Sequence, residues 1–322
     1  MKIGVTGASG FIGRHLIGDL QAAGHTPVAL VRTPAKLGAS GSIEAIEIPS
    51  IGAACDIARL EDAMQGLDVV VHLAASVHDM QGALGEKAYQ DINVIGSGRV
   101  FEAAKAAGVG RFIFISSVKA AGERSGDRPL NAENAPGPED AYGRSKRDAE
   151  ALLGELAAES ACRLVILRPT FVYGWPAVGN FKTLLKAVLE RWPLPLAAIR
   201  NRRDLTYVGN LTAAICTACG AENLGQGPYF ICDGKAVSTP ALVAAAGEAF
   251  SIPARLIYVP VWILRLAGMI TGRSAMIERL CGNLEVDHTP FSRDAGWQAP
   301  YNMADGLRVC AQAYNKGHQG GA

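Results

Sequence analysis

Three glycines near the amino terminus fall at the junction of an apolar strand and an amphipathic helix. The segment Thr6-Gly7-Ala8-Ser9-Gly10-Phe11-Ile12-Gly13 has the spacing G-x-x-G-x-x-G. Gly7 permits a tight turn, Gly10 lets the backbone approach a pyrophosphate, and Gly13 lets the helix pack closely on the strand. The phosphates would then meet the amino terminus of the helix. The pattern predicts a dinucleotide site, with the expected contacts Gly7, Ser9, Gly10, Phe11, Ile12 and Gly13.

Short apolar strands alternate with helices through the first half of the chain. Strands are predicted at 2–5, 28–32, 43–48, 68–75, 111–117 and 163–168, and helices at 11–23 and about 58–66, 81–107 and 140–158. Wholly apolar strands separated by helices are typical of a parallel sheet covered on both faces, and right-handed crossovers make it doubly wound. We therefore predict an α/β protein with a Rossmann-type doubly wound parallel sheet.

The character of the sequence changes after Pro169, where segments become mixed and rich in Pro and Gly. We predict a Rossmann domain of residues 1–169 plus 201–233, with 228–232 as a further strand of the large sheet. Residues 170–200 plus 234–322 are predicted to form a smaller mixed α/β substrate lobe.

The composition excludes several classes of function. Of the 322 residues, 49% are hydrophobic and 19% are charged, which is typical of a globular protein. The net charge of +1 argues against a nucleic-acid partner, because such proteins usually have a strong basic surplus. Seven cysteines without a repeating framework indicate a reduced, cytoplasmic protein. Cys216 and Cys219 form a C-x-x-C in an apolar helical run, and we interpret them as core residues, not as metal ligands.

Residues 259–270 form the most apolar stretch of the chain. The stretch is too short to span a bilayer and contains Arg265. We predict a buried helix, with an interfacial helix or a partner surface as the alternative, and we expect no membrane insertion. Because residues 2–7 already form a strand pattern, we expect no signal peptide before the fold.

The end of the second strand bears on the choice of cofactor. An acidic residue there would bind the adenosine ribose of NAD, whereas Arg32 suits the 2′-phosphate of NADP. An arginine can also stack on adenine and tolerate NAD, so we favour NADP(H) and keep NAD(H) as the alternative. Asp56 and Ile57, after the third strand, are expected at the adenine amino group. Further expected cofactor contacts lie where the fourth strand ends, at Leu73, Ala74 and Ala75.

Tyr142 and Lys146 are four residues apart, which on a helix places both side chains on one face. An ammonium beside a phenol stabilises the phenolate, so we expect Lys146 to lower the pKa of Tyr142. A tyrosine made acidic in this way can pass a proton to or from a sugar or alcohol oxygen near neutral pH. His72 lies on a buried strand and is predicted to be a core histidine, and Ser116 is predicted to point into the sheet.

Together these segments resemble an extended short-chain dehydrogenase/reductase of the NAD-dependent epimerase/dehydratase group, over almost the whole chain. The matching segments, besides the glycine turn, are Val71-His72-Leu73-Ala74-Ala75, Asn93-Val94-Ile95-Gly96, Phe114-Ile115-Ser116-Ser117, Tyr142-Gly143-Arg144-Ser145-Lys146 and Leu167-Arg168-Pro169.

The resemblance implies a catalytic set. Tyr142 would be the general acid/base, and Lys146 would lower its pKa and bind the nicotinamide ribose. Ser117 would hydrogen-bond the reacting oxygen, Asn93 would support a proton relay, and Pro169 would contact the cofactor. Two of these side chains, those of Tyr142 and Lys146, would also contact the cofactor.

One departure from the group narrows the reaction. Sugar-nucleotide 4,6-dehydratases carry Asp-Glu just after the strand-five hydroxyl, and this chain has Val118 and Lys119 there. Without those carboxylates we expect no dehydration. Lys119 at the mouth of the site would touch substrate, or it is an ordinary solvated lysine.

The second lobe resembles the UDP-sugar branch of the group. The resemblance places Asn180 at a diphosphate, Leu196 in a segment that lines the uracil pocket, and Arg203 and Arg279 as diphosphate-binding arginines. Two arginines around a diphosphate suit forked, charge-assisted hydrogen bonds. Each arginine could instead form a structural ion pair.

Within that branch the sequence looks closest to bacterial 4-ketoreductases of the UDP-N-acetylquinovosamine dehydrogenase type. The resemblance implies NAD(P)H-dependent reduction of a UDP-2-acetamido-2,6-dideoxy-4-hexulose. The product would be UDP-N-acetylquinovosamine, or its fucosamine epimer, for surface polysaccharide. Alternatives are a UDP-hexose 4-epimerase with tightly held NAD, a hydrophobic-ketone reductase, and a non-catalytic NAD(P)-sensing module. Helices at about 85–107 and 142–158 resemble the dimer-forming pair of the family, so we expect a homodimer.

Overall fold

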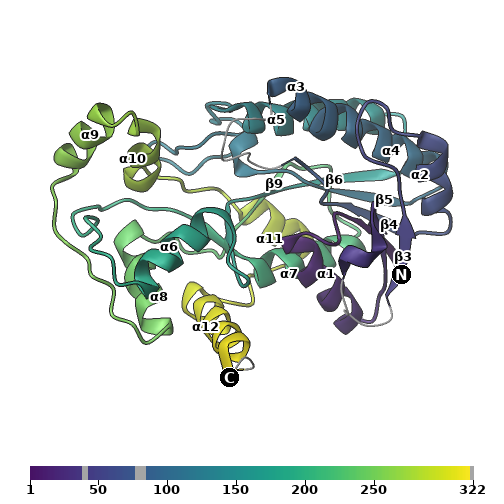
Figure 1. The fold of residues 1–322 in the computed structure, drawn as a ribbon. Helices are drawn as coiled ribbons and strands as arrows, with labels where there is room; N and C mark the ends of the chain where they lie inside the picture. The colour runs from purple at the N-terminus through teal and green to yellow at the C-terminus, as the bar shows by residue number, and fades with distance from the viewer. Residues whose placement is uncertain (38–42, 77–84, 320–322) are drawn as a thin grey trace.

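The computed structural model describes residues 1–37, 43–76 and 85–319 (Figure 1). The first residues of the helix predicted at about 81–107, residues 81–84, lie outside these ranges. Within them, the chain forms a large parallel sheet with helices on both faces and a smaller group of helices and short strands to one side (Figure 1).

The predicted parallel sheet is confirmed. Its seven strands run in the order β3-β2-β1-β4-β5-β6-β9, and every neighbouring pair is parallel. The strands are β1 (Lys2–Thr6), β2 (Thr26–Val31), β3 (Glu44–Glu47), β4 (Val69–His72), β5 (Arg111–Ile115), β6 (Arg163–Pro169) and β9 (Tyr229–Ile231). The strand order reverses between β1 and β4, which is where doubly wound sheets bind their ligands.

Helices cover both faces of the sheet (Figure 1). The helices α2 (Ile57–Met64), α4 (Gly96–Ala106) and α5 (Ala141–Ala157) lie on one face, and α1 (Phe11–Ala22), α7 (Val208–Gly220) and α11 (Thr289–Ala295) on the other. Alternate strand residues supply the two cores: Ile113 and Ile115 of β5 pack on the α1 side, and Phe112 and Phe114 on the α4 side. Between β4 and α4 lie α3 (Glu86–Tyr89) and a π-helix, η2 (Gln90–Ile95).

Elements beyond β6 form a third core. The strands β7 (Phe171–Tyr173) and β8 (Leu205–Tyr207) form a separate parallel pair, which the sequence analysis did not predict. Side chains of three helices pack on this pair: α6 (Gly179–Leu189), α8 (Thr239–Ala249) and α12 (Met303–Gln319). The remaining helices, α9 (Val261–Ile270) and α10 (Ser274–Cys281), lie together at one end of the molecule (Figure 1).

The expectation of a buried helix within 259–270 is wrong. Most side chains of α9 are exposed, and only Leu264 and Gly268 are buried. Even so, no helix in the described ranges is both long and apolar enough to cross a membrane.

His72 is a core histidine, as predicted. Its ring is completely buried, with Nδ1 2.7 Å from Thr6 Oγ1 and Nε2 3.0 Å from Ser97 Oγ. Burial, together with the nearby charge of Lys146, lowers the pKa of His72 to about 3. The ring is therefore neutral at physiological pH and serves the fold.

A buried ion pair joins α5 to β6. The Arg168 guanidinium donates from Nε to Glu150 Oε1 at 2.9 Å and from Nη2 to Glu150 Oε2 at 2.5 Å. Ser116 also donates to Glu150, so its side chain points into the sheet as predicted. Both charged side chains are at most about a tenth exposed. This ion pair holds α5, the helix that carries Tyr142, against the sheet.

Arg168→Met should lower the free energy of unfolding by about 3–5 kcal/mol, because it leaves the Glu150 carboxylate buried without its partner. Urea unfolding followed by circular dichroism measures the change. Arg308→Met is the matched control, because its ion pair with Asp305 is on the surface, and it should change the same quantity by less than about 1 kcal/mol. Equal stability losses in the two variants would contradict this role for the buried pair.

Candidate active site

A cavity of about 790 Å³ opens at the carboxyl ends of β1, β2 and β4. The expected cofactor residues that line it are Gly7, Ser9, Gly10, Phe11, Ile12, Gly13, Arg32, Leu73, Ala74 and Ala75. Its place at the reversal of strand order is the one expected for a dinucleotide in this fold. The structure therefore brings these predicted residues together around one space.

Two glycines of the turn are required by close packing. Gly7 has φ of +69°, and a Cβ there would lie 2.9 Å from the backbone nitrogen of Ala74. A Cβ on Gly13 would lie 2.4 Å from the carbonyl oxygen of Gly7. Both contacts are too short for any side chain, so the turn stays tight and the amino terminus of α1 faces the cavity. The residues present thus fit a dinucleotide pyrophosphate.

Five other expected cofactor residues do not line this cavity: Asp56, Ile57 and Pro169, and the two residues described below, Tyr142 and Lys146. Asp56 caps α2 by accepting from the backbone N–H of Arg59 at 3.3 Å, and Ile57 is the first residue of that helix. Pro169 ends β6 and is buried beside Ile231 of β9. The cavity wall instead includes Ser50, Ile51 and Ile92, together with Leu30, Val31, Thr33, Ile48 and Ser76. The sequence analysis did not select these wall residues, because apolar and small polar types carry no chemical signal.

Tyr142, Ser117 and Lys146 come together at the carboxyl end of β5. Ser117 follows that strand, and its side chain forms a hydrogen bond with Tyr142. Tyr142 lies in the first turn of α5, and its ring packs edge-on to Tyr89 with centroids 6.2 Å apart. Lys146 lies one turn later and is only 2% exposed, with Nζ 4.2 Å from the centroid of the Phe114 ring.

The prediction that the pKa of Tyr142 lies below its ordinary value is wrong. Burial raises the pKa of Tyr142 well above its ordinary value, and the negative charge of Asp140 raises it further. The hydrogen bond with Ser117 acts in the opposite direction but does not prevail. Tyr142 is therefore held as a neutral phenol, the form that donates a proton.

Burial also sets the charge of Lys146. It lowers the pKa of Lys146 to about 7, and the negative charge of Glu150 opposes this change. Glu150 lies one further turn along α5, where Arg168 already binds it. Lys146 thus gains and loses its proton near neutral pH.

Asn93 connects the cavity wall to α5. It is completely buried in the π-helix η2, and its Oδ1 accepts from the backbone N–H of Ser76 at 2.7 Å. Its Nδ2 donates to Ser145 Oγ at 2.9 Å, and Ser145 donates to the carbonyl of Tyr142 at 2.8 Å. These contacts of Asn93 therefore hold the backbone around Tyr142, and a proton relay through Asn93 stays a prediction.

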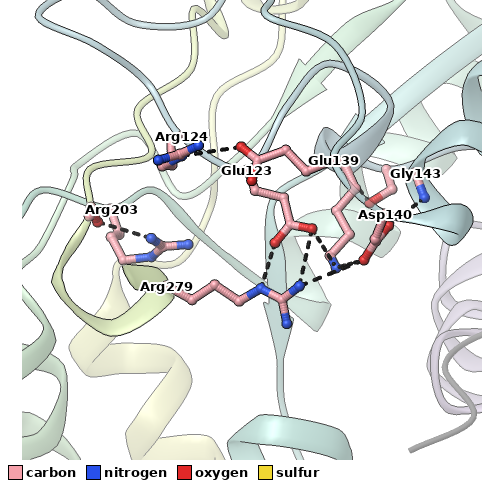
Figure 2. Close-up of polar contacts among 10 residues, drawn as sticks. Glu123, Arg124, Glu139, Asp140, Gly143, Arg203 and Arg279 are labelled. Atoms are coloured by element: carbon pink, nitrogen blue, oxygen red, sulfur yellow. Dashed lines mark hydrogen bonds and ion pairs between the residues drawn. The ribbon is translucent and has the colours of Figure 1, made fainter. Parts of the chain in front are cut away.

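Charged side chains form a network beside this group (Figure 2). Glu123, which is 6% exposed, accepts from Arg279 Nε at 2.6 Å and lies 3.1 Å from Lys119 Nζ. Lys119 also donates to Asp140 Oδ2 at 2.5 Å, and Arg279 Nη2 is 3.8 Å from the same oxygen. Burial tends to raise the pKa of Asp140, but hydrogen bonds from Lys119 and the backbone N–H of Gly143 lower it below its ordinary value.

Asp140 has a second contact that ties the network to the catalytic helix. Its Oδ1 accepts from the backbone N–H of Gly143 at 2.7 Å, which caps the amino terminus of α5 (Figure 2). The sequence analysis missed both Glu123 and Asp140. An Asp three residues before Gly143 is a recognisable helix cap, whereas Glu123 follows no pattern that would have selected it.

The other expected substrate residues lie on separate elements. Arg203 Nη1 donates to the carbonyl of Gly282 at 3.0 Å, and burial lowers the pKa of Arg203. Asn180 is exposed in the first turn of α6, and Leu196 is partly buried in the segment after α6. Their contacts with a substrate stay predictions.

The family model described as "NAD dependent epimerase/dehydratase family" matches residues 3–232. The chain belongs to this family. The match extends from β1 through β9, the last strand along the chain in the large sheet.

Individual relatives agree with this assignment. A protein named UDP-glucose 4-epimerase, from Vibrio cholerae, is 34% identical over 314 residues, which cover 96% of this chain and 94% of that protein. N-acetyl-alpha-D-glucosaminyl-diphospho-ditrans,octacis-undecaprenol 4-epimerase of Escherichia coli O157:H7 is 30% identical over 316 residues, covering 94% of this chain and 91% of that protein. The structure of MoeE5 in complex with UDP-glucose and NAD is 25% identical, has a TM-score of 0.77, and covers 99% of this chain and all of that one.

This epimerase/dehydratase family member is therefore an enzyme of the NAD-dependent oxidoreductase and epimerase type. The two relatives described above carry 4-epimerase names, and the structural neighbour contains UDP-glucose and NAD. The structure brings Ser117 and Tyr142 together, and their catalytic roles stay predictions.

Lys146→Met should stabilise the nucleotide-free protein most below pH 7. The pKa of Lys146 is about 7 in the folded protein and near its ordinary 10.5 when unfolded, so between these values the unfolded chain binds more protons. The contribution of Lys146 to the wild-type free energy of unfolding therefore rises with pH between about 7 and 10.5, because the buried Lys146 ammonium is lost over this range. The advantage of the variant, several kcal/mol at pH 6, should shrink toward pH 10.

Urea unfolding of both proteins at a series of pH values measures this difference. Lys105→Met is the control, since Lys105 is exposed on α4, and its difference from wild type should stay constant with pH. A pH-independent difference for Lys146→Met would show that the ammonium is not buried as described.

Proposed function

We propose that this enzyme transfers a hydride between a nicotinamide cofactor and C4 of a UDP-linked sugar, in the direction that reduces a 4-ketone. The observation that carries the proposal is the hydrogen bond between Ser117 and Tyr142 at the carboxyl end of β5. The bound NAD(P)H supplies the hydride. Ser117 orients the C4 oxygen, and Tyr142 donates a proton to it as the alcohol forms.

The protonation of Tyr142 supports reduction. A ketone reductase needs a neutral phenol at the start of the reaction, and burial and Asp140 both favour that form. Oxidation of an alcohol would need the phenolate first. Lys146, positive below about pH 7, would stabilise the phenolate left after proton transfer and hold the nicotinamide ribose.

The cations beside the site support a diphosphate-linked substrate. Lys119, Arg203 and Arg279 come from three different segments, and forked arginines suit phosphate oxygens. A diphosphate would compete with Glu123 for Arg279. The relatives that carry UDP-sugar names and the sequence resemblance both favour UDP, and we propose a UDP-2-acetamido-2,6-dideoxy-4-hexulose as substrate. The product is UDP-N-acetylquinovosamine or its fucosamine epimer, and we place the reaction in the cytoplasm.

A 4-epimerase is the second candidate, because two relatives at 30% identity or more carry 4-epimerase names. That reaction uses the same residues but returns the hydride to the sugar, so cofactor stays bound and undergoes no net change. Arg32 favours the reductase, since an arginine at the end of β2 suits NADP(H). We also propose a homodimer through α4 and α5, which pack side by side.

The purified enzyme should consume NADPH when given the 4-keto sugar nucleotide. Tyr142→Phe should lower kcat about 10²- to 10⁴-fold with little change in KM, because it removes only the proton donor. Tyr301→Phe, which changes a tyrosine in another part of the fold, should leave kcat unaffected. Consumption of no NADPH, together with interconversion of UDP-sugar epimers by enzyme holding bound NAD, would establish the epimerase instead.

Arg32→Ser should weaken NADPH binding about 10- to 100-fold and leave NADH binding nearly unchanged, since it removes a charged hydrogen-bond donor to the 2′-phosphate. Fluorescence titration with each dinucleotide measures both affinities. Equal losses for NADPH and NADH would indicate that Arg32 stacks on adenine and that NAD(H) is the natural cofactor.

A further inference from the structure

The outer face of α9 is apolar and points away from the rest of the protein. Four large side chains recur at helical spacing on one side of the helix. They are Trp262, Leu266, Met269 and Ile270, with exposed fractions of 66%, 45%, 64% and 77%. The opposite side holds the buried Leu264 and Gly268, and α9 packs on α10.

Neighbouring segments extend this apolar surface. Tyr258, just before α9, is 72% exposed and Ile257 is 45% exposed. Met276 on α10 is 48% exposed. Soluble proteins rarely leave so many large apolar side chains exposed in one region without a partner. In Figure 1, α9 and α10 lie at the end of the molecule farthest from β3, and within the described residues these apolar side chains stay exposed.

The charged residues of this segment are mostly positive. Residues 255–281 contain four arginines, Arg255, Arg265, Arg273 and Arg279, against one acidic residue, Glu278. The whole chain has a net charge of only +1, so this segment is unusually basic. Glu278 is already bound by Arg265, whose Nε donates to it at 3.0 Å.

We propose that the outer face of α9 docks on the surface of an anionic membrane. A helix lying in the interface buries an apolar side into the headgroup boundary, while flanking arginines meet anionic lipids. Trp262 and Tyr258 are of the types that favour the headgroup level. The helix has 10 residues, so it lies on the membrane and does not span it.

A second copy of the chain fits this face less well. Two copies meeting through α9 would bring the same arginine surplus together, and like charges across an interface oppose association. An anionic lipid surface meets both the apolar side chains and the positive charge. The proposal does not depend on the reaction proposed above, because the outer face lies outside the catalytic group.

Docking through α9 would also determine which side of the protein faces the membrane. Helix α10 follows α9 directly and carries Arg279, which binds Glu123 in the charged network. The face therefore places the charged network of Arg279 and Glu123, and not the cavity of the glycine turn, on the membrane side of the protein.

Co-sedimentation of the full chain with vesicles tests the proposal. Vesicles of phosphatidylglycerol mixed with phosphatidylcholine should bind the protein, and vesicles of phosphatidylcholine alone should bind it weakly. Binding should weaken as salt rises, because salt screens the arginines. Trp262→Glu should lower partitioning more than about tenfold, and Arg273→Gln about five-fold. Val309→Glu, which changes an exposed apolar residue of α12, is the matched control and should bind like wild type.

A conservative variant keeps the test informative if Trp262→Glu misfolds. Anionic vesicles should shift the tryptophan fluorescence of wild type to shorter wavelength, and Trp262→Phe should bind the vesicles but lack most of this shift. Absence of wild-type binding to anionic vesicles, or an unchanged fluorescence shift in Trp262→Phe, would overturn the proposal. So would a wild-type dimer that Trp262→Glu converts to monomer in light scattering, which would show that a second copy covers the face.

Discussion

The burial of Lys146 beside Tyr142 is the constraint on which the candidate active site depends. An ammonium only 2% exposed, over the ring of Phe114, is unfavourable unless the surrounding structure holds it there. Two features do so: Asp140 caps the start of α5, and the Glu150–Arg168 pair ties the same helix to β6. With both ends of this segment fixed, Tyr142 lies against Ser117 at the end of β5.

The same burial sets the protonation of the site. Removing both side chains from water raises the pKa of Tyr142 and lowers that of Lys146, so each neutral form is favoured. A buried pair of this kind differs from an exposed one, in which the ammonium would make the phenol acidic. A neutral Tyr142 phenol is the form that the proposed reduction requires. Asp140 connects the charged network to the helix of Tyr142, because its carboxylate accepts a hydrogen bond from Lys119 and also caps α5.

Local patterns predicted the cofactor side well. The glycine turn, Arg32 and the end of β4 all line one cavity, because consecutive parallel strands end at the same edge and their following residues must meet there. Asp56 shows the limit of this reasoning. It follows a strand as expected, but its carboxylate caps α2, because the first N–H groups of a helix need acceptors. The residues that line the wall instead are apolar or small and polar, and they carry no recognisable pattern.

The sequence by itself determined the parallel sheet, the place of the dinucleotide turn and the Tyr142-Lys146 pair, since each follows from periodicity or spacing along a single segment. Ser117 lies on another segment and was selected only through the family resemblance. Only the tertiary structure decided the direction of the Tyr142 pKa shift, the partnership of Glu123 with Lys119 and Arg279, and the exposure of α9. Desolvation and long-range ion pairs depend on which segments pack together, and residues 123 and 279 are joined only by the fold. An apolar helix such as α9 has the same sequence pattern whether a core or solvent lies against it, so packing alone settles which face is covered.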